Sequence, residues 1–204
     1  TWIELPDVQK ELLAAMHKTG KPVILVNCSG SAIGFGAVET QYTALLQAWY
    51  GGQAAGLAVA DVLFGDYNPA GRLPVTFYKS TDQLPDFENY DMEGRTYRYF
   101  RGEPLYAFGY GLSYTTFEYG NANLSRNSIK AGKGVKVSIP VTNSGKYDGD
   151  EVVQVYVKSL DNPDAPIKSL KGFKRVNIAA GTTATVTIEL DSKAFEFYDE
   201  SVDE

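Results

Sequence analysis

Hydrophobic positions in the first part of the chain follow a helical period and then a continuous run. Residues 6–20, PDVQKELLAAMHKTG, predict a helix that packs along one apolar stripe, formed by Val8, Leu12, Ala15 and Met16. The run KPVILVNCS at 21–29 is apolar and β-branched, which is typical of a strand covered on both faces. We therefore expect Cys28, inside this run, to be a buried small hydrophobe.

Helix and strand patterns continue to alternate up to about residue 80. The second part of YTALLQAWY (42–50) is short, aromatic and followed by Gly51 and Gly52, which favours a strand. QAAGLAVADVLFG (53–65) predicts a helix that Gly65 ends, and YNPAGRLPVTF (67–77) predicts a turn that leads into an extended segment. This alternation indicates an α/β fold with a mostly parallel sheet and covering helices.

After about residue 120 the apolar positions follow a period of two. KGVKVSIPVTN (133–143), EVVQVYVKS (151–159) and TATVTIEL (183–190) alternate in this way between polar turn clusters. This pattern predicts an all-β part, an antiparallel sandwich of the immunoglobulin or fibronectin type III kind. We count six strands at most, the last being AFEFYDE (194–200), so we expect this sandwich to lack its last strand and to continue beyond Glu204.

The segment between the two parts, residues 81–120, is rich in aromatic residues. Nine tyrosines or phenylalanines lie between Tyr97 and Tyr119, whereas a flexible linker would be poor in them. We expect the segment to be buried, and its stretch LYAFGYGLSYTTF (105–117) to supply domain-junction anchors: Phe108, Leu112, Tyr114 and Phe117. Gly109 and Gly111 would let the backbone turn or approach closely.

Composition excludes several classes of function. The 204 residues fit two domains, and the net charge of −6 argues against nucleic acid as a partner. No window approaches 18 consecutive apolar residues, so we expect no membrane span. His17 is the single histidine and Cys28 the single cysteine, which leaves no disulfide, no His/Cys metal site and no motif for a histidine-dependent triad.

Two segments carry candidate ligand-binding residues. The loop SGSAIGFG (29–36) follows a strand at its carboxyl end, where α/β folds bind ligands, and this makes Ser29, Gly30 and Ser31 cleft candidates. In GRTYRY (94–99), three residues offer hydrogen-bond donors and stacking faces for a sugar: Arg95, Tyr97 and Arg98. The alternative for these arginines is an ion pair across the domain boundary.

Acidic residues are numerous enough that some pairs always look catalytic. Asp91 and Glu93 are two apart in an aromatic neighbourhood, and Asp61 lies on an apolar helix. We expect Asp91 and Glu93 to make polar contacts within the linker, and Asp61 to pack or cap its helix.

Several segments, in this order and at these spacings, resemble one family. They are ELPDVQKELL, GKPVILVNCSGSAI, LLQAWYGGQAAGLAVADVLFGDYNPAGRLPVTF, LYAFGYGLSYTTFEY, VTNSGKYDGDEVVQVYV and LKGFKRVNIAAG. Together they resemble the C-terminal portion of the family 3 glycoside hydrolases, the β-glucosidase and β-xylosidase family. The resemblance implies a TIM-like barrel, then an α/β sandwich, then a fibronectin type III-like domain. Residues 1–80 would be the C-terminal part of the α/β sandwich, 81–120 the junction, and 121–204 the fibronectin type III-like domain.

The resemblance also implies where the catalytic groups lie. Retaining glycoside hydrolysis needs two carboxyl groups about 5–5.5 Å apart. In the family the nucleophile is an Asp on the barrel, and no residue of this chain corresponds to it. The acid/base is a Glu that would fall just upstream of Thr1, and Glu4, inside the matched segment, is not that Glu. We therefore expect no catalytic residue in this chain.

The implied parent is an exo-acting β-glucosidase or β-xylosidase that removes terminal non-reducing sugars from oligosaccharides or aryl β-glycosides. The resemblance implies no organic cofactor and a barrel on the same polypeptide as the partner. Members of the family are often periplasmic or secreted, and the location of this protein is left open. An alternative is a non-catalytic carbohydrate- or protein-binding β-sandwich module. The absence of tryptophan from residue 133 onward disfavours it, since the tyrosines there are only Tyr147, Tyr156 and Tyr198. A structural fragment without activity of its own is the third reading.

Replacing Phe108 by Ala is expected to loosen the two halves of the chain and to lower the melting temperature. The physical reason is the loss of a buried aromatic ring, which contributes about 1.5–3 kcal/mol. Thermal unfolding followed by circular dichroism measures this, and an unchanged melting temperature would argue against an anchoring role.

Overall fold

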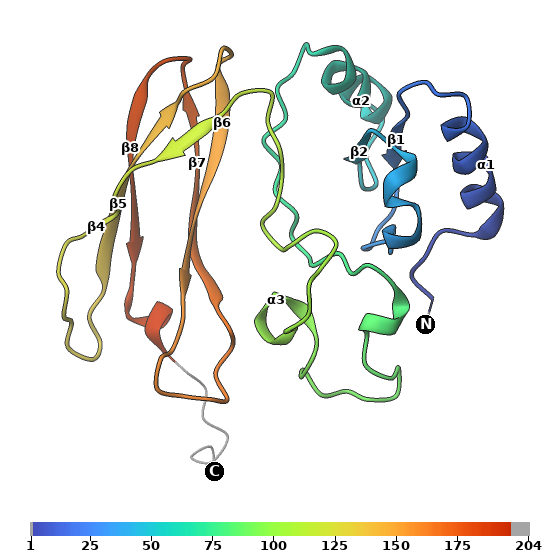
Figure 1. Ribbon diagram of the computed structural model, residues 1–204. Coiled ribbons are helices and arrows are strands. Elements are labelled where there is room, and N and C mark those ends of the chain that lie inside the picture. The colour runs from blue at the N-terminus through green and yellow to red at the C-terminus, as the bar shows by residue number, and fades with distance from the viewer. Residues whose placement is uncertain (1, 197–204) are drawn as a thin grey trace. The chain divides into compact units, whose positions relative to one another are not determined.

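The computed structural model describes residues 2–196, which form two compact units (Figure 1). The first, the α/β unit, contains the chain up to Tyr67 together with Leu73–Tyr110. The second, the sandwich unit, contains Asn68–Arg72 and the described residues from Gly111 onward. The chain therefore passes into the sandwich unit for five residues, returns to the α/β unit and then leaves it again. The domain limits at residues 80 and 120 stay a prediction.

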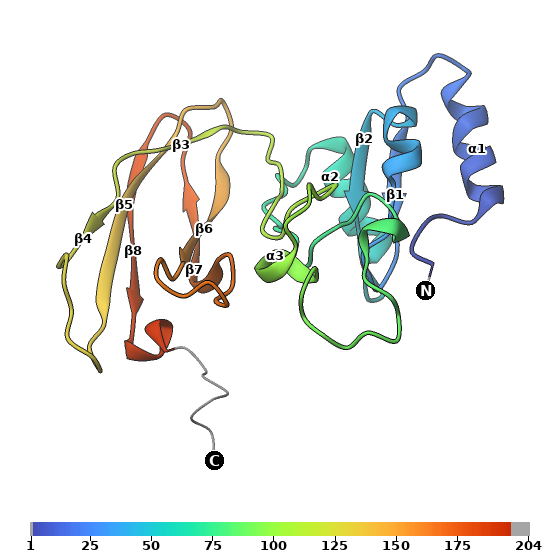
Figure 2. The same ribbon diagram turned by 60° about the horizontal axis from the view of Figure 1, so that its bottom comes forward.

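The α/β unit is built around two parallel strands, β1 (Ile24–Asn27) and β2 (Ala44–Gln47), with Ile24 opposite Ala44 and Asn27 opposite Gln47. In both views these strands lie between α1 (Asp7–His17) and α2 (Ala55–Phe64) (Figures 1 and 2). The parallel sheet with covering helices is thus confirmed. Gly65, at φ 87°, ends α2 in the left-handed conformation, as the sequence predicts. The shorter helices are η1 (Gly36–Gln41), η2 (Thr81–Gln83) and α3 (Thr96–Tyr99).

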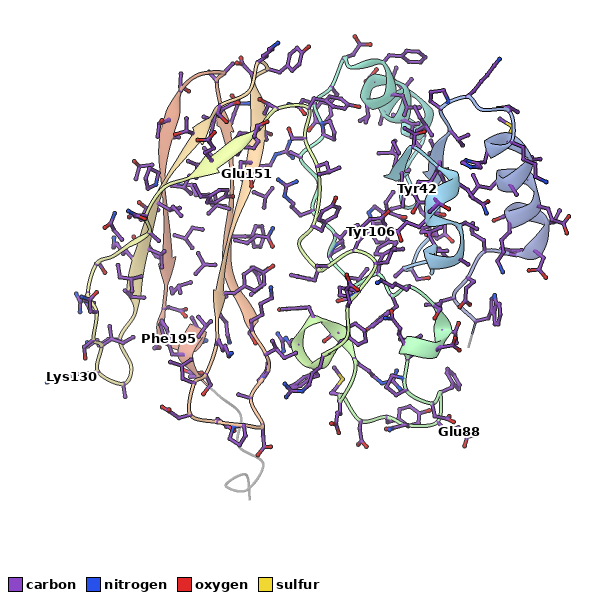
Figure 3. All side chains as sticks on the ribbon, viewed as in Figure 1. Tyr42, Glu88, Tyr106, Lys130, Glu151 and Phe195 are labelled. Atoms are coloured by element: carbon purple, nitrogen blue, oxygen red, sulfur yellow. The ribbon has the colours of Figure 1, made fainter. Side chains whose placement is uncertain are left out.

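The core of the α/β unit is mainly aliphatic and aromatic, and Phe35 and Phe77 are its largest fully buried side chains. Phe77 meets Trp49 and Tyr106 edge to face, with ring centroids 6.2 Å apart in each pair. The hydroxyl groups of Tyr42 and Tyr106 lie 3.0 Å apart (Figure 3). Burial of the ring, and the hydrogen bond to Tyr106, raise the pKa of Tyr42 far above its ordinary value. This pair therefore stays neutral, and each partly buried hydroxyl group has a partner.

The apolar stripe predicted on α1 does not face this core. Val8, Leu12 and Met16 are 71%, 63% and 50% exposed, while Leu13, off the stripe, is the buried residue of the helix. Among the described residues of α1, Leu13 is the one that belongs to the buried core. Cys28 is exposed as well, since β1 ends one residue before it. Both predictions of burial are wrong.

The N-terminal segment is held by one carboxylate. The Gly34 amide donates to the Ile3 carbonyl (2.8 Å), and the Thr81 amide and hydroxyl donate to Glu4 Oε1 (2.6 Å) and Oε2 (2.7 Å). Burial raises the pKa of the Glu4 carboxyl, but these hydrogen bonds outweigh it, and the net pKa lies below the ordinary value. Glu4 thus acts as an ionised structural acceptor at the start of η2.

The sandwich unit has two antiparallel sheets (Figures 1 and 2). The central strand of the first, β5 (Val135–Asn143), pairs with β3 (Phe117–Tyr119), β4 (Asn123–Leu124) and β8 (Thr183–Leu190). The second joins β6 (Gly149–Val157) to β7 (Ser169–Ile178). The predicted strands at 133–143, 151–159 and 183–190 are confirmed, and alternate residues of β5, β6 and β8 line the core.

The end of the described chain differs from the prediction. Ser192–Phe195 is a 3-10 helix, η3, because the Asp191 side chain accepts a hydrogen bond from the Ala194 amide and caps it. The start of the strand predicted at 194–200 is therefore wrong, and residues 197–200 lie outside the described residues. No helix among residues 2–196 has the length and apolar character needed to cross a membrane.

The five residues Asn68–Arg72, here called the strap, are held in the sandwich unit by polar contacts. Asn68 Nδ2 donates to the Asp148 carbonyl (3.1 Å), and its Oδ1 accepts from the Ser113 hydroxyl (2.9 Å) and the Tyr114 amide (2.8 Å). At the other end of the strap, Arg72 Nη2 donates to Glu151 Oε2 over 2.5 Å. The strap therefore completes this unit although it is distant from it in sequence.

The ion pair of the strap is well shielded from water. The side chains of Arg72 and Glu151 are 14% and 8% exposed, and Tyr119 Oη donates to Glu151 Oε1 (2.6 Å) (Glu151 is labelled in Figure 3). Burial of the Tyr119 ring and its bond to this carboxylate raise the pKa of Tyr119. Nη1 of Arg72 is buried without a hydrogen-bond partner among the described residues. Charges shielded in this way are tolerated only as a pair.

Within the stretch 105–117, residues 111–114 are held by close backbone approach and polar bonds. Gly109 has φ 80°, and a Cβ at Gly111 would lie 2.1 Å from the Gly71 carbonyl oxygen, so the predicted turn and close approach are confirmed. Leu112 and Tyr114 are 70% and 48% exposed, and the burial predicted for them is wrong. The reason is that Asn68, rather than an apolar pocket, holds this backbone.

The other two predicted anchors make ring or core contacts. Phe108 stacks on Tyr97 with centroids 4.1 Å apart, and Phe117 packs against the sandwich core. Their role as anchors between domains stays a prediction.

Replacing Arg72 by Met is expected to destabilise the chain by about 3–5 kcal/mol, because it leaves the Glu151 charge buried without its partner. The double variant R72M/E151Q removes both charges and is expected to recover most of that loss. Urea unfolding of the two variants and of the unchanged chain measures the difference. A double variant that is no more stable than R72M would contradict the pairing.

Glu4 makes stability depend on pH. Its pKa is lowered on folding, so its contribution is complete above the ordinary value of 4.5 and is lost as the pH falls through the folded value. The difference in melting temperature between the unchanged chain and E4Q should therefore shrink between about pH 7 and pH 3. The exposed Glu11, replaced by Gln, is the control for removal of one surface carboxyl group. A difference that stays constant across this range would refute the structural role of Glu4.

Candidate functional site

The carboxyl edge of the parallel strands carries a network of neutral polar side chains. Asn27 and Gln47 are opposite each other at the ends of β1 and β2, and Asn27 Nδ2 donates to Gln47 Oε1 (2.6 Å) and to Ser29 Oγ (2.7 Å). The Ser29 hydroxyl in turn donates to the Ser31 carbonyl (2.8 Å). These bonds hold the loop after β1 in one conformation, at the edge where α/β folds bind ligands.

The loop after β2 packs against the same residues. A Cβ at Gly30 would lie 2.7 Å from Cε2 of the Tyr50 ring, so this ring rests on the Gly30 backbone. Trp49 has φ 53°, a left-handed conformation that is uncommon outside glycine and is often found at functional sites. Ser29, Gly30 and Ser31, the cleft candidates from the sequence, thus lie together with an aromatic residue that the sequence did not single out.

The N-terminal segment lies beside this loop. Glu4 and Gly34 form a parallel bridge, and the Gly34 amide donates to the Ile3 carbonyl. Gly34 belongs to the loop that begins at Ser29. Residues 2–4 therefore run alongside the loop that carries the cleft candidates.

Arg95, Tyr97 and Arg98 form a separate set of contacts. Arg95 donates to three carbonyl groups of its own loop, those of Asp86 (3.1 Å), Asn89 (2.5 Å) and Asp91 (3.1 Å). It therefore organises the loop, and the ion pair across the domain boundary considered for it stays a prediction. The Tyr97 ring stacks on Phe108, and the Arg98 guanidinium lies 6.0 Å from the Tyr97 ring centroid. Thr96, at φ 55°, donates its amide to the Tyr78 hydroxyl (2.7 Å) and fixes the start of α3.

The acidic candidates have local surroundings of an ordinary kind. Asp91 and Glu93 are exposed, and the Asp91 amide donates to the Asn89 side chain (2.7 Å). The Asp61 carbonyl accepts a hydrogen bond from the Tyr67 amide (3.0 Å) just after α2. His17 is exposed in the last turn of α1. None of these four residues has the buried, charge-coupled surroundings of a catalytic acid.

A hollow of about 460 Å³ lies on the sandwich unit. Its charged residues have both signs, and two of them, Lys136 and Glu189, form an ion pair with each other. The residues that line it are Ser125, Arg126, Gly134, Val135, Lys136, Lys171, Glu189, Leu190 and Asp191. None of its lining residues is aromatic, whereas the carboxyl edge of β1 and β2 has an aromatic ring beside a polar network, so we prefer that edge as the candidate site.

The sequence missed Asn27, Gln47 and Tyr50 as members of this site. A signal was present for the first two, since each is the first polar residue after an apolar run and parallel strands end at one edge of a sheet. Tyr50 gave no such signal, because the contact between its ring and Gly30 joins loops twenty residues apart.

Comparisons with known proteins agree on the relatives of this chain. The family model described as "Glycosyl hydrolase family 3 C-terminal domain" matches residues 1–114, and that described as "Fibronectin type III-like domain" matches residues 151–204. The chain is 55% identical over 98% of its length to the "Xylan 1,4-beta-xylosidase" of Xylanibacter ruminicola. It is 38% identical over 99% of its length to the "Periplasmic beta-glucosidase" of Salmonella typhimurium. It spans 23% and 28%, respectively, of the length of these two relatives.

Solved structures give the same result. The β-glucosidase of Listeria innocua in complex with isofagomine matches 99% of this chain with a TM-score of 0.85 and 32% identity, and 30% of that protein is covered. A β-glucosidase from Erythrobacter marinus matches 97% of the chain at the same TM-score and 37% identity, with 27% of that protein covered. In this chain a fibronectin type III-like domain follows the glycosyl hydrolase domain. Sequence, family model and structure therefore agree that the chain belongs to the family described as the glycosyl hydrolase family 3 C-terminal domain.

Proposed function

We propose that this chain is the C-terminal part of a retaining, exo-acting β-glycoside hydrolase that removes terminal non-reducing β-linked xylose or glucose. The observation that carries the proposal is the match of 98% of the chain to a β-xylosidase of which it spans 23%. In such an enzyme both catalytic carboxyl groups would come from the preceding part of the polypeptide, the nucleophile from a barrel and the acid/base from just upstream of Thr1. The chain itself would bind and orient, without taking part in proton transfer.

The position of residues 2–4 supports this arrangement. They run beside the loop that starts at Ser29, and a chain covers at most about 3.3–3.6 Å per residue. An acid/base a few residues upstream would then lie within roughly 10–20 Å of Ile3. The cleft candidates Ser29, Gly30 and Ser31 would form one wall next to that carboxyl group. Arg95, Tyr97 and Arg98 are the second proposed contact with substrate.

Exposed apolar surface on the α/β unit supports the proposal that this chain is part of a longer polypeptide. Val8, Leu12 and Met16 on α1, and Leu57 and Phe64 on α2, are all at least half exposed. Soluble proteins rarely leave such contiguous apolar faces open to water. The partner we propose for these faces is the remainder of the same polypeptide, including its barrel.

The purified chain alone is expected to hydrolyse neither p-nitrophenyl β-D-xyloside nor p-nitrophenyl β-D-glucoside, because it lacks the pair of carboxyl groups that the reaction needs. The full polypeptide that carries the chain is expected to hydrolyse at least one of them. Release of p-nitrophenol under identical conditions measures both.

Two variants make this test specific. Turnover by the chain alone that Asp91→Asn or Glu93→Gln abolishes would contradict the proposal, since it would place a catalytic pair inside the chain. A full polypeptide that is folded but inactive on both aryl glycosides would contradict the proposed activity.

A further inference from the structure

Tyr50 is an exposed aromatic residue on the wall proposed above. It lies three residues after the end of β2 and is 79% exposed, while Asn27, Gln47 and Trp49 are partly buried. Its ring lies against Gly30, where a Cβ would come within 2.7 Å of Cε2 and 3.3 Å of Cδ2. Most of the ring surface is therefore open to solvent at the edge of the sheet where α/β folds bind ligands.

The support beneath this ring is rigid. Trp49, the preceding residue, packs its own ring against the buried Phe77, and the backbone after Tyr50 turns tightly, since a Cβ at Gly51 would lie 2.5 Å from that of Ala55. The loop under the ring is tied to the ends of both strands through Ser29 and Gln47. An aromatic ring held from below in this way can bind a ligand without losing much conformational freedom.

The chemistry around the ring suits a sugar. A pyranose presents C–H groups on its faces and hydroxyl groups at its rim, so it is matched by an aromatic surface bordered by hydrogen-bonding groups. Here the ring is bordered by the exposed Ser31 and the partly buried Ser29, whose neighbours are neutral amides. The described surroundings hold no charged group in contact with the ring, which favours a neutral ligand.

We propose that Tyr50 is a substrate-binding residue on which a pyranose ring of the β-xyloside or β-glucoside stacks, and that Gly30 is the residue that permits its position. This inference rests on the proposed function. It adds a stacking surface to a wall for which the sequence indicated only small polar residues.

The test uses the full polypeptide that carries this chain, with the variants Tyr50→Ala and Tyr50→Phe. Tyr50→Ala is expected to raise KM for the preferred aryl glycoside and its disaccharide about five- to ten-fold with kcat unchanged, because stacking contributes equally to ground-state and transition-state binding. Tyr50→Phe keeps the ring and should remain close to the unchanged enzyme. Tyr147, a tyrosine of the sandwich unit that is 62% exposed, gives the control variant Tyr147→Ala, which should leave KM unchanged.

A second comparison isolates the contact with Gly30. The Gly30 backbone lies outside the left-handed region, so alanine is tolerated there, but its Cβ would displace the Tyr50 ring. Gly30→Ala should raise KM in the unchanged enzyme and have no further effect in the Tyr50→Ala variant. Independent, additive effects of the two substitutions would overturn the role assigned to Gly30.

Other outcomes decide between this inference and the proposed function. An unchanged KM in Tyr50→Ala, or a fall in melting temperature with kcat and KM both preserved, would overturn stacking and indicate that another part of the polypeptide packs on the ring. If the polypeptide hydrolyses neither aryl glycoside, the proposed function fails, and saturation-transfer NMR with xylobiose and cellobiose tests Tyr50 by itself. A transfer signal that Tyr50→Ala abolishes supports the sugar contact, and an absent signal, or one unaffected by the substitution, overturns it.

Discussion

The buried ion pair between Arg72 and Glu151 is the constraint on which the course of the chain depends. Both side chains are shielded from water, and each would be costly to bury without the other. The strap that carries Arg72 must therefore lie in the sandwich unit whenever that unit is folded. As a result, the chain has to leave the α/β unit after Tyr67 and return to it at Leu73, and the α/β unit is assembled from two separate stretches.

Hydrogen bonds of polar side chains also hold the backbone at the start of the sandwich unit. The side-chain amides of Asn68 and Asn143 each form hydrogen bonds with several backbone or hydroxyl groups. Asn143 is fully buried. It accepts a hydrogen bond from the Thr115 hydroxyl (2.6 Å) and donates to the Tyr147 and Ile178 carbonyls. A buried amide with all its partners in place specifies one arrangement of the strands around it. Residues 113–115 are therefore positioned by these bonds, and Leu112 and Tyr114 remain exposed.

The candidate site is held together by neutral polar groups, in contrast to the buried ion pair of the strap. At the carboxyl edge of β1 and β2, neutral amides and hydroxyl groups hold two loops without any charged group among them. Such a surface can orient a neutral ligand, but it has no group that could transfer a proton at a glycosidic bond. This division of labour agrees with a family in which the chain spans about a quarter of its relatives and the catalytic carboxyl groups are proposed to lie in the remainder.

The sequence by itself determined the elements with a clear period and the family. The alternation in β5, β6 and β8 identified the sandwich, since a period of two puts every second side chain on one face whatever the neighbours are. Motif order identified the relatives, and Gly65, Gly109 and Gly111 marked positions that only glycine fits. Tertiary structure alone decided which apolar residues are buried, because burial depends on the surface opposite: on α1 Leu13 is buried, whereas Val8, Leu12 and Met16 are exposed. It also decided that Arg72 meets Glu151 and that Tyr50 rests on Gly30, since contacts between residues twenty to eighty positions apart follow from chain topology and leave no local pattern.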